Sequence, residues 1–109
     1  MTGTKRQQAI RKSLRAFVPH IPLSEAEAVL VRACAAKMKS LSPPVALWLS
    51  LTSHIRHSHT DYDQLLDEGY ERDAARFFVV GSTDAILASW GCARGVADVP
   101  EEEDALQGA

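Results

Sequence analysis

Apolar residues recur along much of the chain at steps of three and four, the spacing that gathers side chains on one side of an α-helix. Between residues 5 and 17, Ile10, Leu14 and Phe17 follow this spacing, and the basic residues lie mostly on the remaining surface. Residues 18–22 include two prolines, each of which lacks an amide donor and pushes the preceding residue out of helical geometry. The pattern therefore predicts an amphipathic helix over residues 5–17, followed by a connector.

A second helix is predicted over about residues 25–39. Ser24 followed by Glu27 fits a capping box, in which the two side chains accept hydrogen bonds from amides at the helix start. The apolar residues of this segment form one stripe, and Cys34 belongs to that stripe. We therefore expect Cys34 to lie in the core.

A third helix is predicted from residue 43 to about residue 56 or 57. Ser42 suits the N-cap, and Pro43 suits the first helical position, where a missing amide donor is harmless. Apolar side chains surround nearly the whole axis of this segment. A helix of this kind is buried, so we expect it at the centre of the fold.

The next segments predict a short fourth helix and a longer fifth one. Residues 60–63, Thr-Asp-Tyr-Asp, resemble a capped helix start, and Gly69 suits the position just past the helix end. From Glu71 to Gly91, a fifth helix would gather apolar side chains on one side, with Gly81 as the point where it kinks or splits. That apolar side comprises Ala74, Phe77, Phe78, Ala85 and Ala88.

No segment alternates apolar and polar residues over more than a few positions, so the chain is predicted to be all-α. At 109 residues it is long enough for one modest core. We expect a small irregular, orthogonal bundle of four to five helices in a single domain over residues 1–94. Residues 95–109 are rich in acidic and poor in apolar side chains, which predicts a flexible acidic tail.

Composition bears on the setting in which the protein works. No apolar run approaches the roughly 20 residues that cross a bilayer, so the sequence excludes a membrane-spanning role. Two cysteines, Cys34 and Cys92, lie far apart without a CxxC spacing, so a disulfide has no support. We expect reduced thiols and a cytoplasmic protein.

The formal net charge of −2 conceals an asymmetry along the chain. Residues 1–60 contain nine Lys and Arg and two acidic residues, whereas residues 61–109 contain three and twelve. Basic residues supply most of the non-specific affinity of a protein for nucleic-acid phosphates. Arg11, Lys12 and Arg15 of the first helix are therefore candidate phosphate-binding residues, and an ordinary solvated helix face is the alternative.

Residues 54–76 concentrate ionisable side chains directly after a nearly uncharged apolar run. We expect the corner at residues 56–60 to extend the phosphate-binding surface, because guanidinium groups suit bidentate contacts with phosphate. The alternative is a structural network in which the arginines bind neighbouring side chains and fix the fourth helix. The candidate ligand residues are Arg56, His57, His59, Arg72 and Arg76, and Thr60, Tyr62 and Asp63 would hold their geometry.

The histidines of this segment also suggest a metal site or a hydrolase. His54, His57 and His59 would act with Asp61 or Asp63. On a continuous helix, however, His59 points about 200° away from His57. The segment also has no HExxH motif and no nucleophile elbow. We therefore expect no metal ion or cofactor, and a small hydrolase or metal-assisted enzyme is the second hypothesis.

A protein-interaction module is the third hypothesis, in which the apolar surface of the predicted fifth helix or the acidic tail docks on a partner. Trp90, near the end of the predicted fifth helix, would be the anchor if it is exposed. Core packing is the alternative role for this side chain.

The chain resembles an uncharacterised family, catalogued as domain of unknown function 2293, in residues 18–28 (VPHIPLSEAEA) and 42–79 (SPPVALWLSLTSHIRHSHTDYDQLLDEGYERDAARFFV). The likeness extends over most of residues 5–92, and its most specific part runs from Arg56 to Leu66. The resemblance implies no established activity, cofactor or catalytic residue. The leading hypothesis therefore remains a non-enzymatic module that binds RNA or DNA.

Overall fold

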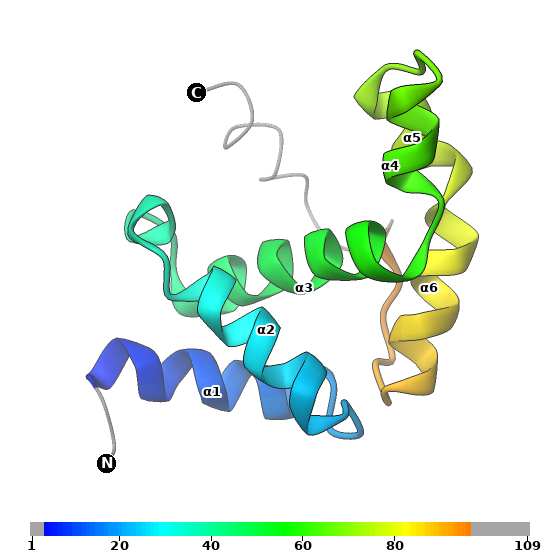
Figure 1. Cartoon of the computed structure of the whole chain (residues 1–109). Helices are drawn as coiled ribbons and strands as arrows, with labels where there is room; N and C mark the ends of the chain where they lie inside the picture. Colours follow the sequence, from blue (N-terminus) through cyan, green and yellow to red (C-terminus); the bar gives the residue numbers. More distant parts are fainter. Residues whose placement is uncertain (1–3, 97–109) are drawn as a thin grey trace.

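The computed structural model describes residues 4–96 (Figure 1). Its elements are α1 (Lys5–Phe17), α2 (Leu23–Ala33), the 3₁₀-helix η1 (Ala36–Met38), α3 (Pro43–His59), α4 (Tyr62–Asp67), α5 (Arg72–Phe78) and α6 (Val80–Ser89). No strand occurs among these residues, which confirms the predicted all-α class. The predicted acidic tail lies almost wholly outside the described residues.

The central element of the fold is α3. Figure 1 shows α1 and α2 on one side of α3, α6 beside its C-terminal end, and the α4–α5 pair projecting away on the other side. Leu47, Leu51 and Ile55 of α3 are completely buried, as expected for a central helix. They pack in one core with residues of α1, α2 and α6: Ile10, Leu14, Ala26, Val29, Ala33 and Leu87. None of the described helices combines the length and the apolar character needed to cross a bilayer.

The bounds of α1 are as predicted, whereas α2 starts and ends earlier than predicted. Pro22 is the N-cap of α2 and no side chain caps the helix, so the predicted capping box of Ser24 and Glu27 is wrong. After α2 the chain turns into η1, whose Met38 is buried. Cys34 follows the helix end and is exposed, so the prediction of a core cysteine is also wrong.

Near its C-terminal end, α3 continues slightly beyond the predicted limit, to His59. The hydroxyl of Thr60 donates a hydrogen bond to the backbone carbonyl of Arg56 at 2.5 Å. The same hydroxyl accepts one from the backbone N–H of Tyr62 at 3.2 Å. Thr60 therefore links the last turn of α3 to the first residue of α4.

The predicted fifth helix is two helices, α5 and α6. They meet at Val79, whose φ of −104° and ψ of 9° depart from helical values. Gly81 lies within α6, so the predicted break at Gly81 is displaced to Val79. For this reason the described residues contain six α-helices rather than four or five.

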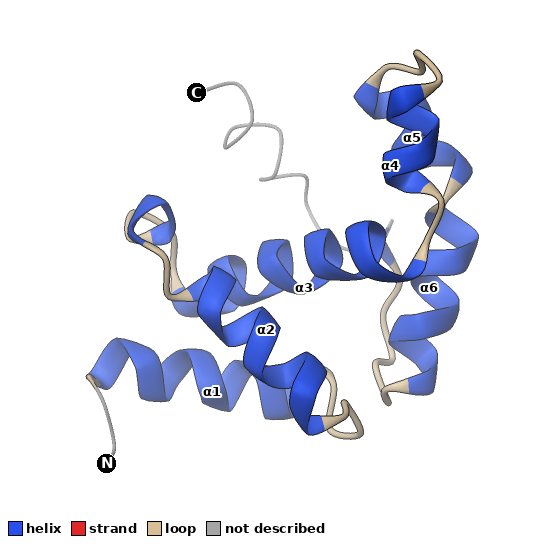
Figure 2. Cartoon of the chain, viewed as in Figure 1, coloured by secondary structure: helices blue, strands red, loops and turns tan. Residues whose placement is uncertain are grey.

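A helical hairpin forms from α4 and α5, which are joined by a short loop (Figure 2). Its interior is a small cluster that includes Tyr62, Ala75 and Val79. Because this hairpin projects away from α1 and α2 (Figure 1), none of the described helices covers the side of α5 that carries Phe77 and Phe78. Phe77 and Phe78 of α5 are 74% and 59% exposed, so this apolar part of the predicted fifth helix lies on the surface.

Candidate functional site

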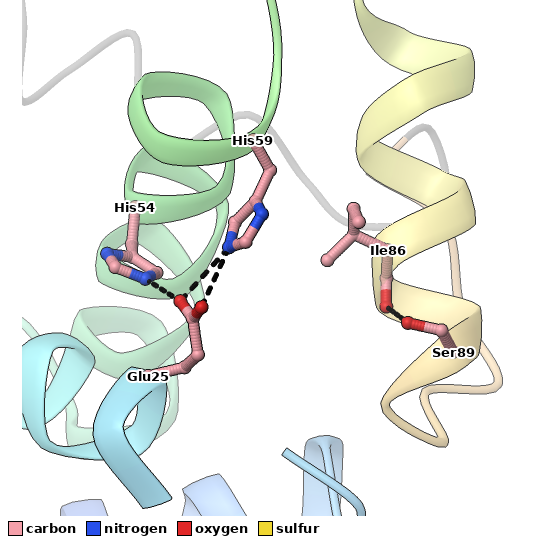
Figure 3. Close-up of polar contacts among 5 residues, drawn as sticks. All are labelled: Glu25, His54, His59, Ile86 and Ser89. Carbon is pink, nitrogen blue, oxygen red and sulfur yellow. Dashed lines mark hydrogen bonds and ion pairs between the residues drawn. The ribbon is translucent and has the colours of Figure 1, made fainter. Parts of the chain in front are cut away.

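Glu25, His54 and His59 meet at the junction of α2 and α3 (Figure 3). Oε1 of Glu25 lies 2.5 Å from Nε2 of His54 and 3.0 Å from Nε2 of His59. Oε2 of Glu25 lies 3.1 Å from the same nitrogen of His59. One ligand atom from each residue lies within 4.8 Å of the others, a separation at which the described side chains can hold a metal ion.

Two helices supply this cluster. Glu25 lies in the first turn of α2. His54 and His59 are five residues apart in α3, so their side chains leave the helix axis about 140° apart. They still converge because the carboxylate of Glu25 lies between them on the facing helix (Figure 3).

The cluster is buried on the His54 side and more open at His59. The exposed fractions of the side chains are 10% for His54, 23% for Glu25 and 28% for His59. The ring of His59 packs edge-to-face on Trp90, with centroids 5.7 Å apart. Trp90 itself is buried in the main core, so it has the core-packing role that the sequence offers as its alternative and is not an exposed anchor for a partner.

The two imidazoles also favour the charged form of the carboxylate. Two hydrogen bonds, the one from His54 having the larger effect and the one from His59 the smaller, lower the pKa of Glu25 from its ordinary value of 4.5. Burial acts in the opposite direction, and electrostatic attraction to both rings adds a smaller lowering effect. The carboxylate is therefore ionised at neutral pH and available as an acceptor or as a metal ligand.

His57 makes a separate set of contacts. Its Nδ1 lies 2.6 Å from Oδ1 of Asp63, and its ring packs edge-to-face on Tyr62 with centroids 5.2 Å apart. The three histidines of the second hypothesis therefore do not converge: His54 and His59 share Glu25, whereas His57 faces α4.

The arginines near this corner differ in accessibility. Arg56 is 5% exposed, and its guanidinium lies over the ring of Tyr62, 5.4 Å from the ring centroid. Arg76 binds Asp73 one turn earlier in α5 at 2.5 Å, whereas Arg72 is exposed. Burial of Arg56 removes it from the exposed surface that the sequence predicts. Tyr62 does contact an arginine, as the structural alternative predicts.

The candidate phosphate-binding residues fall into two groups. Arg11, Lys12 and Arg15 are exposed on α1. Arg72 and Arg76 lie on α5, which Figure 1 shows on the opposite side of α3 from α1. The predicted continuous surface is therefore divided by the body of the fold.

Sequence reasoning missed Glu25 as a site residue. It is one of two acidic residues among the first 60, but an acid in the first turn of a helix is an ordinary stabilising feature. Its histidine partners come 29 and 34 positions later in the chain. Only the packing of α2 on α3 reveals the cluster.

A family model described as uncharacterized conserved protein (DUF2293) matches residues 13–91 of the chain. This segment contains Glu25, both histidines of the cluster and most of the helical fold. No curated protein and no solved structure matches the chain.

Proposed function

The chain belongs to the DUF2293 family of uncharacterized conserved proteins, and we propose that it is a cytoplasmic module that binds the phosphates of RNA or DNA through α1. The observation that carries the proposal is a positive stripe on the exposed side of this helix. The stripe consists of Lys5, Arg11, Lys12 and Arg15, all of which are exposed. No acidic residue lies in α1.

The stripe lies opposite the side of α1 that packs into the core. Ile10 and Leu14 are buried, and the four basic residues occupy the remaining surface. From Lys5 to Arg15 the helix rises about 15 Å. Duplex DNA carries roughly one phosphate charge per 1.7 Å of axis, so a stripe of this length can contact several phosphates.

Other candidate residues are less suited to this role. Arg56 is buried, and the imidazoles of His57 and His59 each contact a carboxylate. Arg72 is exposed, but it lies on the α4–α5 hairpin, which is rich in exposed acidic residues. A polyanion would be repelled there. The proposal is therefore confined to α1.

The experiment is a salt series of binding to duplex DNA, single-stranded DNA and RNA, measured by fluorescence anisotropy with the full chain. We expect micromolar affinity at low salt that falls steeply as salt rises. On duplex DNA the logarithmic salt slope is about −0.9 per neutralised phosphate. Because the Lys12→Gln/Arg15→Gln variant lacks two basic residues, its logarithmic salt slope on duplex DNA should be shallower by up to about 1.8. Its affinity for all three nucleic acids should also be lower.

Arg72→Gln is the matched control for Arg15→Gln, because both remove one exposed arginine from a helix. We expect Arg15→Gln to weaken binding and Arg72→Gln to leave it unchanged. Equal loss in the two variants would mean that only net charge matters. Absence of binding at low salt would discard the proposed function.

A further inference from the structure

We propose that Glu25, His54 and His59 bind a divalent transition-metal ion, with zinc as the best match to the ligand set. The site is independent of phosphate binding by α1, since it uses other residues on other helices. It also differs from the site considered for the histidine-rich segment, because His57 takes no part and the carboxylate comes from α2 instead of from Asp61 or Asp63.

The first support is the chemistry of the three donors. Two imidazole nitrogens and one carboxylate oxygen form the set found in catalytic zinc sites, which keep a further position for water. Non-haem Fe(II) sites use the same combination. Neither Cys34 nor Cys92 belongs to this group of described side chains, so the ligand set contains no thiolate.

The second support is geometric. Zinc bonds to imidazole and carboxylate are about 2.0–2.2 Å long, so tetrahedral ligand atoms lie roughly 3.3–3.5 Å apart. The nitrogen–oxygen distances of 2.5–3.1 Å would have to widen by less than about 1 Å. The ligand nitrogens of the two histidines, which lie within 4.8 Å of each other, would have to approach. Small rotations of three side chains that already point to a common centre achieve both changes (Figure 3).

The third support is the surrounding structure. His54 is fixed in the buried part of α3, and the ring of His59 is held against Trp90. Packing of this kind orients ligands before the metal arrives. The greater exposure of Glu25 and His59 leaves a side through which a hydrated ion can enter and on which water can remain bound.

The principal test uses the full chain, freed of metal by a chelator and titrated with zinc chloride by isothermal calorimetry. We expect one zinc ion per chain with a dissociation constant in the micromolar range or below. Cobalt(II), titrated in parallel, should give the visible absorption of a four- or five-coordinate site. A hydrogen-bonded cluster without metal affinity would give neither signal, and that result overturns the proposal.

Variants identify the ligands. His59→Ala and Glu25→Gln should each weaken zinc binding by more than the roughly 10- to 100-fold that loss of an outer-shell partner costs. His57→Ala is the matched control, since it removes an imidazole from the same turn of α3 without touching the cluster. Equal weakening by His57→Ala and His59→Ala would overturn the assignment.

A measurement on the unsubstituted chain keeps the test valid if a variant fails to fold. The chain has four histidines, whose ring nitrogens are resolved by long-range proton–nitrogen NMR. Zinc should shift the ring signals of His54 and His59 and leave those of His20 and His57 in place. Shifts confined to His20 or His57 would contradict the proposed site.

Discussion

Glu25 connects two helices through its charge. Its carboxylate accepts hydrogen bonds from His54 and His59 and so joins the first turn of α2 to the end of α3. These same bonds lower the pKa of Glu25 below 4.5, even though burial opposes the change. Because folding lowers the pKa of Glu25, the contribution of this residue to the free energy of unfolding depends on pH.

The sign of that dependence predicts the behaviour of Glu25→Gln in acid. The contribution of Glu25 is complete above its ordinary pKa of 4.5 and is lost as the pH falls through the lower value of the folded state. At neutral pH we expect Glu25→Gln to be less stable than the unsubstituted chain by about 1–3 kcal/mol, because a charged hydrogen-bond partner is lost. As the pH falls below 4.5, this difference should shrink.

Urea unfolding followed by circular dichroism across this pH range measures both effects. Glu27→Gln is the control, because Glu27 is exposed on the same helix and should leave the pH profile unchanged. Parallel profiles for Glu25→Gln and the unsubstituted chain would show that the histidine contacts do not stabilise the ionised carboxylate.

At the scale of elements, the end of α6 is fixed by close contact with the connector between α1 and α2. The backbone N–H of His20 donates to the carbonyl of Trp90 at 2.9 Å. Gly91 follows with φ of 89°, and a Cβ atom there would lie 2.9 Å from Nδ1 of His20 and 3.0 Å from Cγ of Pro19. Glycine is therefore required both by the backbone conformation and by the available space.

Gly91→Ala should consequently lower the free energy of unfolding by about 1–3 kcal/mol through backbone strain and the close contacts. Gly81→Ala, inside α6, is the control, since a Cβ at Gly81 meets nothing within 4 Å. Alanine favours the helix more than glycine does, so Gly81→Ala should raise stability by about 0.5–1 kcal/mol. Thermal and urea unfolding of the two variants provide the comparison, and a loss of stability in both would contradict this account.

Elements with clear signals at both ends were predictable from sequence. The bounds of α1 follow from its apolar spacing and the two prolines after it, and Gly69, with φ of 101°, follows α4 as expected. The break at Val79 was not predictable, because valine does not mark a helix end and Gly81 nearby does. Exposure of Phe77 depends on which helices are near α5, and apolar spacing within one helix carries no information about its neighbours.

The same limit applies to the candidate metal site. The sequence drew attention to the histidines of α3, and two of the three are in the cluster. Helical geometry correctly indicated that His57 and His59 diverge. The third ligand comes from another helix, and a contact between residues 29 positions apart is a property of packing rather than of local pattern.

At the scale of the whole molecule, charge is separated between the two sides of α3. The exposed stripe of α1 is basic, whereas the α4–α5 hairpin on the other side carries mainly acidic exposed residues (Figure 1). These are Asp61, Asp63, Asp67, Glu68, Glu71 and Asp73. Such a distribution would turn α1 toward an approaching polyanion and repel it from the hairpin.

The acidic residues after position 97 also contribute to the net charge of the chain. Deletion of residues 98–109 removes five acidic and no basic side chains, so the formal net charge changes from −2 to +3. If these acids compete with phosphates for the stripe on α1, deletion should strengthen binding to duplex DNA several-fold at low salt. The gain should fade as salt rises, because screening weakens both the competition and the binding.

Two further chains separate the possible causes of such a gain. Replacing the five acids by Asn and Gln keeps the length of the segment and should strengthen binding as much as deletion does, since charge rather than bulk is the cause. The same deletion in the Lys12→Gln/Arg15→Gln variant should bring a smaller gain in affinity, because this variant lacks two of the basic residues for which the acids would compete. Unchanged affinity after deletion would rule out competition by the acidic segment, while leaving the proposed role of α1 to be decided by its own variants.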